Sequence, residues 1–191
     1  MRGIVLASRS SAREHLLRQT GIRFKVTPST IPEDGIGPAS EEQIKNLALT
    51  KARDVASRIK NSIVIGADTV IIHRRKMIGK PRNSTEARKI LKRLNGSVHC
   101  VVTGIAVVDA TTGKEATACV KTSVEMKRMS EHEIEAYVAT GEPLGKAGAY
   151  GVQGKGAIFI KRINGCYYNV VGLPLPKLAD MLRKFQISLI Q

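Results

Sequence analysis

Short apolar runs alternate with amphipathic helical segments along this chain, and that alternation restricts the fold more than any other feature. Residues 3–7 are an apolar run of the length of a buried strand, and residues 11–19 follow as a helix with Leu16 and Leu17 on its inner side. Residues 41–60 then repeat apolar side chains at three- and four-residue spacing, which is typical of a longer amphipathic helix. Strands that alternate with helices predict an α/β protein.

The remaining elements are marked by β-branched runs, turn residues and helix caps. Strands are predicted at residues 62–65, at 70–78 as a hairpin turning at Arg74-Arg75, at 98–109 and 115–126 as a long hairpin, and at 157–163. Helices are predicted to begin at Asn83, where Glu86 completes a capping-box-like pair, at Ser130 with Glu133, and after Pro174.

Size and cysteine content exclude several classes of protein. The chain has 191 residues, 42% hydrophobic and 25% charged, which fits one globular domain rather than a disordered segment. Its three cysteines form no CxxC pair, so we exclude a disulfide framework and a zinc ribbon and expect a reduced, cytoplasmic protein. We see no signal-peptide core and no apolar run of membrane-spanning length, and predict no membrane partner.

The net charge points to a polyanionic partner. Lys and Arg number 31 against 16 Asp and Glu, a formal charge of +15, which suits nucleic acid, anionic lipid or phosphorylated small molecules. A general solubility bias explains the same excess equally well. Aromatic residues are only 4% and Trp is absent, so nucleic acid is the less favoured partner.

The first candidate site is the junction between the first strand and the first helix. Hydroxyls from Ser8, Ser10 and Ser11 precede Arg13 there, and a helix N-terminus binds anions through its unpaired amides. The alternative is a serine N-cap followed by a solvated arginine.

Two charged residues stand out because they lie in apolar surroundings. Lys51 falls within the apolar stripe of the helix at 41–60, so it must either extend to solvent or meet a negative partner. Asp68 is predicted just past a buried strand, after a turn at Gly66, where carboxylates of α/β proteins face bound ligands. It suits a metal ligand or a base toward water, and an Asx turn is the alternative.

Two glycine-containing segments complete the candidates. In Gly79-Lys80-Pro81, the lysine is fixed between a permissive and a rigid residue, which suits a phosphate contact or an ordinary turn. Residues 146–157 are rich in glycine without a Walker or dinucleotide fingerprint, so they indicate either close approach of backbone to a ligand or a bulged hairpin. Carboxylates, lysines and glycine loops together fit a phosphoanhydride site with a metal.

Eight blocks in this order resemble the Maf family of nucleotide pyrophosphatases. They are LASRSSAREHLL, Glu33, NLALTKA, GADTV, GKP, VVTGIAVVD, KAGAYGVQG and NVVGLPL. The resemblance implies a mixed twisted sheet flanked by helices, two lobes around a central cleft, and a homodimer. It also implies hydrolysis of nucleoside triphosphates to the monophosphate and pyrophosphate, with Mg²⁺ or Mn²⁺ as cofactor.

The resemblance further implies a role for individual residues. GADTV and VQG look like the branch that acts on dTTP, UTP and modified pyrimidine triphosphates, with Thr69 and Gln153 against the base. Glu33 and Asp68 would hold the metal, and Asp68 would also activate water. The phosphate path would be lined by Ser8, Arg13, Lys51, Lys80 and Lys146.

One departure from the family pattern bears on activity. The family's first motif usually reads SxSPRR, whereas Ser11 and Ala12 here replace the proline and the first arginine. Loss of a bidentate phosphate contact costs on the order of 2–3 kcal/mol, roughly a hundredfold in rate, where nothing replaces it. We therefore expect weaker activity or a shifted substrate. The alternatives are a nucleic-acid-binding or regulatory protein with a vestigial site, and a purine-directed pyrophosphatase.

Overall fold

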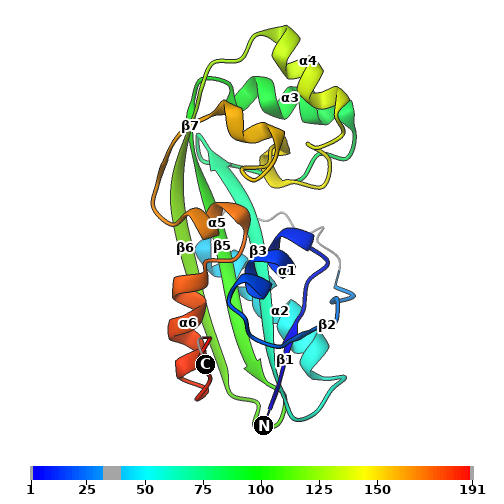
Figure 1. Ribbon diagram of the computed structural model, residues 1–191, viewed down its shortest axis with the longest axis vertical. Helices are drawn as coiled ribbons and strands as arrows, with labels where there is room; N and C mark the ends of the chain where they lie inside the picture. The colour runs from blue at the N-terminus through cyan, green and yellow to red at the C-terminus, as the bar shows by residue number, and fades with distance from the viewer. Residues whose placement is uncertain (1, 32–39, 190–191) are drawn as a thin grey trace. The chain divides into compact units, whose positions relative to one another are not determined.

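The computed structural model describes residues 2–31 and 40–189, and the chain divides into two compact units (Figure 1). The first unit comprises Met1–Asp68, Thr103–Val120 and Gly172–Gln191, and the second comprises Thr69–Val102 and Lys121–Val171. A mixed seven-stranded sheet has the order β2-β1-β3-β5-β6-β7, with β4 paired to β3. Strands β3 (Ser62–His73), β5 (Val98–Asp109) and β6 (Glu115–Met126) contribute residues to both units. The predicted α/β class with a mixed sheet flanked by helices is confirmed.

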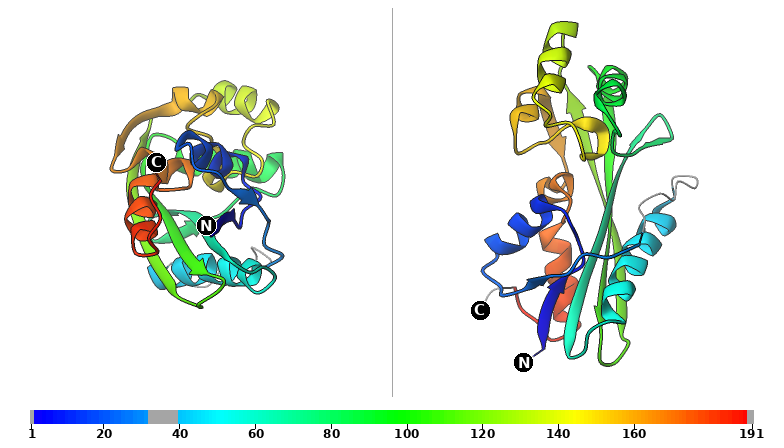
Figure 2. Two further views of the ribbon diagram at one scale, coloured as in Figure 1. Left: turned by 60° about the horizontal axis from the view of Figure 1, so that its bottom comes forward. Right: turned by 90° about the vertical axis from the view of Figure 1, so that its right-hand side faces the viewer.

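In the first unit, helices cover both faces of the sheet. Strand β1 (Gly3–Leu6) pairs in parallel with β2 (Lys25–Val26) and with β3, where Ile4 lies opposite Ile63. Figure 2 shows α2 on one face and α1 and α6 on the other. These helices are α1 (Ser11–Gln19), α2 (Glu41–Ala56) and α6 (Leu175–Arg183).

Two glycines let α2 approach the sheet closely. A Cβ atom on Gly66 would lie 2.3 Å from the Ala48 carbonyl oxygen, and one on Gly104 would lie 2.4 Å from that of Ile44. Such contacts with backbone cannot be relieved by a side-chain movement. The predicted turn at Gly66 is therefore wrong: β3 continues through Asp68 to His73, and the glycine serves helix–sheet packing.

The second unit packs short helices around its own apolar core. Its elements are β4 (Lys76–Ile78), α3 (Ser84–Leu94), α4 (Glu131–Ala139), the 3₁₀ turns η1 (Ala147–Ala149) and η2 (Lys155–Phe159), β7 (Ile160–Asn164) and α5 (Tyr167–Val171). The core joins aliphatic side chains of α3 and α4 to the aromatic rings of Tyr137, Tyr150 and Phe159. The predicted hairpin turn is confirmed, because Arg74 and Arg75 both adopt positive φ between β3 and β4.

Apart from β3, element boundaries follow the caps and turns closely, with two further exceptions. The long hairpin at 98–109 and 115–126 is confirmed at all four ends, and Ser130 and Glu133 form the predicted capping box. The helix expected to reach residue 60 ends at Ala56, and the strand expected from residue 157 begins at Ile160, because η2 occupies the intervening residues. Within the described residues, no helix is long and apolar enough to cross a membrane.

Buried His99 makes the stability of the protein depend on pH. The ring is 3% exposed, and its Nε2 atom lies 2.7 Å from the Tyr150 hydroxyl. Burial, and secondarily the neighbouring His73, lowers the pKa of His99 to about 4. In the unfolded state the ring takes up a proton at about pH 6.5. The contribution of His99 to the free energy of unfolding is therefore fully present above that pH and is lost as the pH falls toward 4. The free energy of unfolding falls by about 3 kcal/mol from above pH 6.5 to the acid end of this range.

Thermal unfolding between about pH 4 and pH 7 measures this dependence. We expect His99→Gln to flatten the acid side of the profile, because the side chain no longer titrates. His132→Gln is the matched control, since His132 is exposed on α4 of the same unit and should leave the slope unchanged. A His99→Gln profile as steep as that of the natural protein would contradict this account.

Candidate active site

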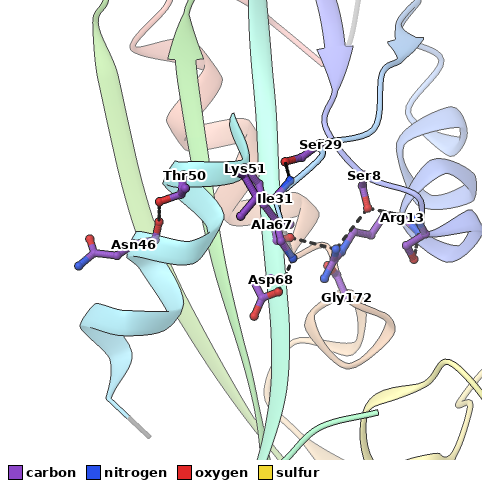
Figure 3. Close-up of polar contacts among 11 residues, drawn as sticks. Ser8, Arg13, Ser29, Ile31, Asn46, Thr50, Lys51, Ala67, Asp68 and Gly172 are labelled. Carbon is purple, nitrogen blue, oxygen red and sulfur yellow. Dashed lines mark hydrogen bonds and ion pairs between the residues drawn. The ribbon is translucent and has the colours of Figure 1, made fainter. Parts of the chain in front are cut away.

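Arg13 joins three parts of the first unit at the end of β1. It is 8% exposed, although it lies in the first turn of α1. Its Nε donates to the Gly172 carbonyl oxygen at 2.8 Å, and its Nη1 donates to the Ala67 carbonyl oxygen at 3.0 Å and to Ser8 Oγ at 3.3 Å (Figure 3). Ser10 caps the helix by accepting from the Arg13 amide, as the N-cap alternative expects, but that alternative's solvated arginine is wrong. The guanidinium carries its charge in a buried position.

Lys51 and Asp68 form a buried ion pair. Lys51 Nζ lies 2.7 Å from Asp68 Oδ1, and the two side chains are 5% and 12% exposed. Figure 3 shows the lysine reaching from α2 to the aspartate on β3. Of the two outcomes expected for a lysine in an apolar stripe, the structure shows a negative partner. Burying two charges costs more free energy than a hydrophobic pair would, so a functional reason for the pair is more plausible than a stabilising one.

Asp68 lies at the point where β3 passes from the first unit to the second. Ala67, whose carbonyl accepts from Arg13, immediately precedes it. Ser8 contacts Arg13, and Lys51 contacts Asp68. The two pairs are linked through the chain, because Arg13 donates to the carbonyl of Ala67, the residue before Asp68. The sequence placed Ser8 and Arg13 in one candidate site, and the structure adds the pairing of Lys51 with Asp68.

The donor set at Asp68 fits a hard divalent cation. Its Oδ1 atom accepts from Lys51, and no hydrogen bond to Oδ2 is found within the described residues. A carboxylate oxygen is the ligand that Mg²⁺ and Mn²⁺ prefer. Glu33, the other predicted ligand, lies outside the described residues. Within residues 2–31 and 40–189, no three His, Cys, Asp or Glu side chains converge, so a cation would need Glu33 or substrate oxygens as well.

Four predicted site residues belong to the second unit. Thr69 directly follows Asp68 on β3, and Lys80 is exposed in the segment after β4. Lys146 donates to the Glu142 carbonyl oxygen at 2.7 Å, and Gln153 is exposed in the turn between η1 and η2. The structure shows the glycine-rich segment as two 3₁₀ turns, rather than the bulged hairpin that was one alternative.

Sequence reasoning missed the carboxylate around which this segment is built. Glu142 accepts hydrogen bonds from the Tyr137 hydroxyl at 2.9 Å and from the Lys155 and Gly156 amides at 2.8 and 3.0 Å. The glycine spacing was the available signal: it indicated close approach of backbone to something. One group that the backbone approaches is the carboxylate of Glu142, because a Cβ atom on Gly154 would lie 2.6 Å from its Oε2 atom.

Comparisons with known proteins agree with the resemblance over nearly the whole chain. The family model "Maf-like protein" matches residues 3–185. A relative from Pelotomaculum thermopropionicum, named dTTP/UTP pyrophosphatase, is 50% identical over 188 residues, covering 97% of each chain. Relatives of the same name from Dictyoglomus thermophilum and Alkaliphilus metalliredigens are each 45% identical and cover 98% and 100% of both chains. This chain belongs to the Maf family.

Proposed function

We propose that the protein is a nucleoside triphosphate pyrophosphatase that converts dTTP and UTP to the monophosphate and pyrophosphate. The observation that carries the proposal is the buried pair of Lys51 and Asp68, two opposite charges that the fold keeps beside the buried guanidinium network of Arg13. The full-length relatives named dTTP/UTP pyrophosphatase support the same substrates.

The chemistry is hydrolysis at the α-phosphorus. Asp68 orients a water molecule and accepts its proton, while the water oxygen bonds to the α-phosphorus. The bond from that phosphorus to the oxygen bridging to the β-phosphate breaks, and pyrophosphate leaves with the electron pair. Lys51 holds the Asp68 carboxylate in place and supplies positive charge near the phosphates.

Ser8 and Arg13 supply the phosphate-binding part of the first unit. The Ser8 hydroxyl accepts from the Ser10 amide at 3.2 Å as well as from Arg13, so the loop before α1 is held in one conformation. Preorganised groups stabilise developing charge without reorganising during the reaction. In the second unit, Lys80 and Lys146 add cations for the phosphates.

A divalent cation completes the proposed chemistry. Asp68 and Glu33 would hold Mg²⁺ or Mn²⁺, which would neutralise phosphate charge and polarise the phosphoryl group when bound. For the base, Thr69 and Gln153 are the contacts that the family pattern supplies. A glutamine amide both donates and accepts, which matches the N3–H and O4 groups of thymine and uracil. As the resemblance implies, we further propose a homodimer, and the cysteine content supports a cytoplasmic location.

Pyrophosphate release from a panel of triphosphates tests the proposal. The panel contains dTTP, UTP, CTP, GTP, 7-methyl-GTP and ITP, each with Mg²⁺ or Mn²⁺. We expect turnover of dTTP and UTP with an intact monophosphate product, which would also show that Ala12 is tolerated where the family has arginine. Preferred turnover of ITP or GTP would move the protein to the purine-directed class. A folded protein silent on every substrate would overturn the proposal in favour of a binding protein.

A further inference from the structure

We propose that Glu142 and Tyr137 are positioning residues that fix the segment carrying Gln153, and through it set the preference for uracil over cytosine. The inference rests on the proposed function, in which Gln153 contacts the base. It assigns a purpose to a half-buried carboxylate to which the proposed hydrolysis gives no role.

Glu142 and Tyr137 hold the backbone on both sides of Gln153. Before it, the Gly151 amide donates to the Tyr137 hydroxyl at 3.1 Å. After it, the Lys155 and Gly156 amides donate to the Glu142 carboxylate at 2.8 and 3.0 Å. The Tyr137 hydroxyl itself donates to Glu142 at 2.9 Å, so the two attachments are one connected network.

Glycines let the backbone of the segment approach this network closely. A Cβ atom on Gly156 would lie 2.5 Å from the Tyr137 hydroxyl oxygen, and one on Gly154 would lie 2.6 Å from Glu142 Oε2. A Cβ atom on Gly151 would meet the Lys146 side chain first, at 2.9 Å, and Glu142 Oε1 at 3.2 Å. Gly154 thus lets the backbone approach the Glu142 carboxylate, Gly156 lets it approach the Tyr137 hydroxyl, and Gln153 remains exposed at the turn.

The protonation states keep this network intact at neutral pH. Burial acts to raise the pKa of Glu142, but the hydrogen bonds from Gly156, Lys155 and Tyr137 outweigh it and lower the pKa below its usual value. Burial raises the pKa of Tyr137 far above its usual value, so its hydroxyl keeps the proton that it donates. An ionised carboxylate that accepts three hydrogen bonds is a strong anchor for backbone amides.

Fixing the backbone matters because a glutamine amide can be turned around. Uracil presents a donor at N3 and an acceptor at O4, whereas cytosine presents an acceptor at N3 and a donor at N4. Rotating the amide by half a turn exchanges its donor and acceptor, so a freely placed glutamine would serve both bases. This rotation takes place within the side chain, so discrimination depends on the position and direction from which the amide reaches the base. A backbone fixed on both sides of Gln153 restricts that approach, whereas a backbone that can shift would let the amide meet either base.

The ratio of kcat/KM for UTP to that for CTP measures the proposed role. We expect Glu142→Gln to lower this ratio by about tenfold, because one end of the amide presents N–H donors to backbone amides. Tyr137→Phe removes only the hydroxyl, keeps the ring that packs edge-on against Phe159, and should lower the ratio in the same direction. Glu131→Gln is the matched control, since this exposed glutamate on α4 pairs with Lys92 and should leave the ratio unchanged.

A double-variant comparison separates positioning from general destabilisation. In a Gln153→Ala background, Glu142→Gln should change the UTP-to-CTP ratio by less than about twofold, because the group that it positions is gone. Loss of kcat/KM on both nucleotides by the same factor, with the ratio unchanged, would overturn the inference and leave a purely structural role. If Glu142→Gln does not fold, Tyr137→Phe decides the matter by the same ratio. A natural protein that releases no pyrophosphate from UTP would instead overturn the proposed function.

Discussion

Replacing Asp68 with asparagine is expected to reduce turnover of dTTP by about a thousandfold or more while leaving the protein folded. A catalytic base and metal ligand loses both functions when its carboxylate becomes an amide, and general-base catalysis alone contributes about 10² to 10⁴ in rate. The protein should remain folded but become less stable: the asparagine oxygen can still accept from Lys51, which donates to Asp68 at 2.7 Å, but the lysine loses the negative charge beside it. The measurements are kcat with dTTP and the unfolding temperature of both proteins.

The matched control for this experiment is Asp180→Asn. Asp180 lies on α6 of the same unit and forms an exposed ion pair with Arg183, so its replacement should change neither kcat nor the unfolding temperature appreciably. An Asp68→Asn protein that keeps more than about a tenth of the natural kcat would remove Asp68 from the mechanism.

Local rules account for the elements that the sequence predicted correctly. Ser130 and Glu133 satisfy each other's amides wherever the rest of the chain lies, so the capping box identifies the start of α4. Thr112-Gly113 places a turn between two β-branched runs, and Gly113 indeed has a positive φ of 73°. The burial of Lys51 followed from helical periodicity, since its neighbours on the stripe include Ala48 and Val55.

Tertiary packing accounts for what the sequence did not predict. Glycine is common in turns, which is why a turn was predicted at Gly66. The structure needs a glycine there for another reason: the Ala48 carbonyl of α2 packs against it. Arg13 had the appearance of a solvated first-turn residue, and its burial depends on carbonyls of Ala67 and Gly172, distant in the chain. The spacing of the glycines indicated a close approach of the backbone but not its partner, because two of the three groups that donate to Glu142 are backbone amides, which every sequence contains.

The buried pair also predicts a large effect on stability when only one partner is removed. Lys51→Met should destabilise the protein by about 3–5 kcal/mol, because the Asp68 carboxylate, 12% exposed, would lose the charge beside it. For a chain of this length, that corresponds to a fall of roughly 10 °C in unfolding temperature. Arg53→Met is the control on the same helix: its ion pair with Glu115 is exposed, so we expect a change below about 1 kcal/mol.

Removing both charges tests whether the loss comes from the unpaired carboxylate. Lys51→Met combined with Asp68→Asn removes both charges of the pair, so we expect it to recover most of the stability lost in Lys51→Met alone. The single variant Lys51→Met and the double variant should both be inactive. Stability and activity would thus be separated, because stability depends on the balance of charge in the pair, whereas activity needs both charged side chains. A Lys51→Met protein as stable as the natural one would show that Asp68 does not depend on the lysine. The ion pair would then contribute nothing to the free energy of unfolding, and only the loss of kcat would support a functional role for it.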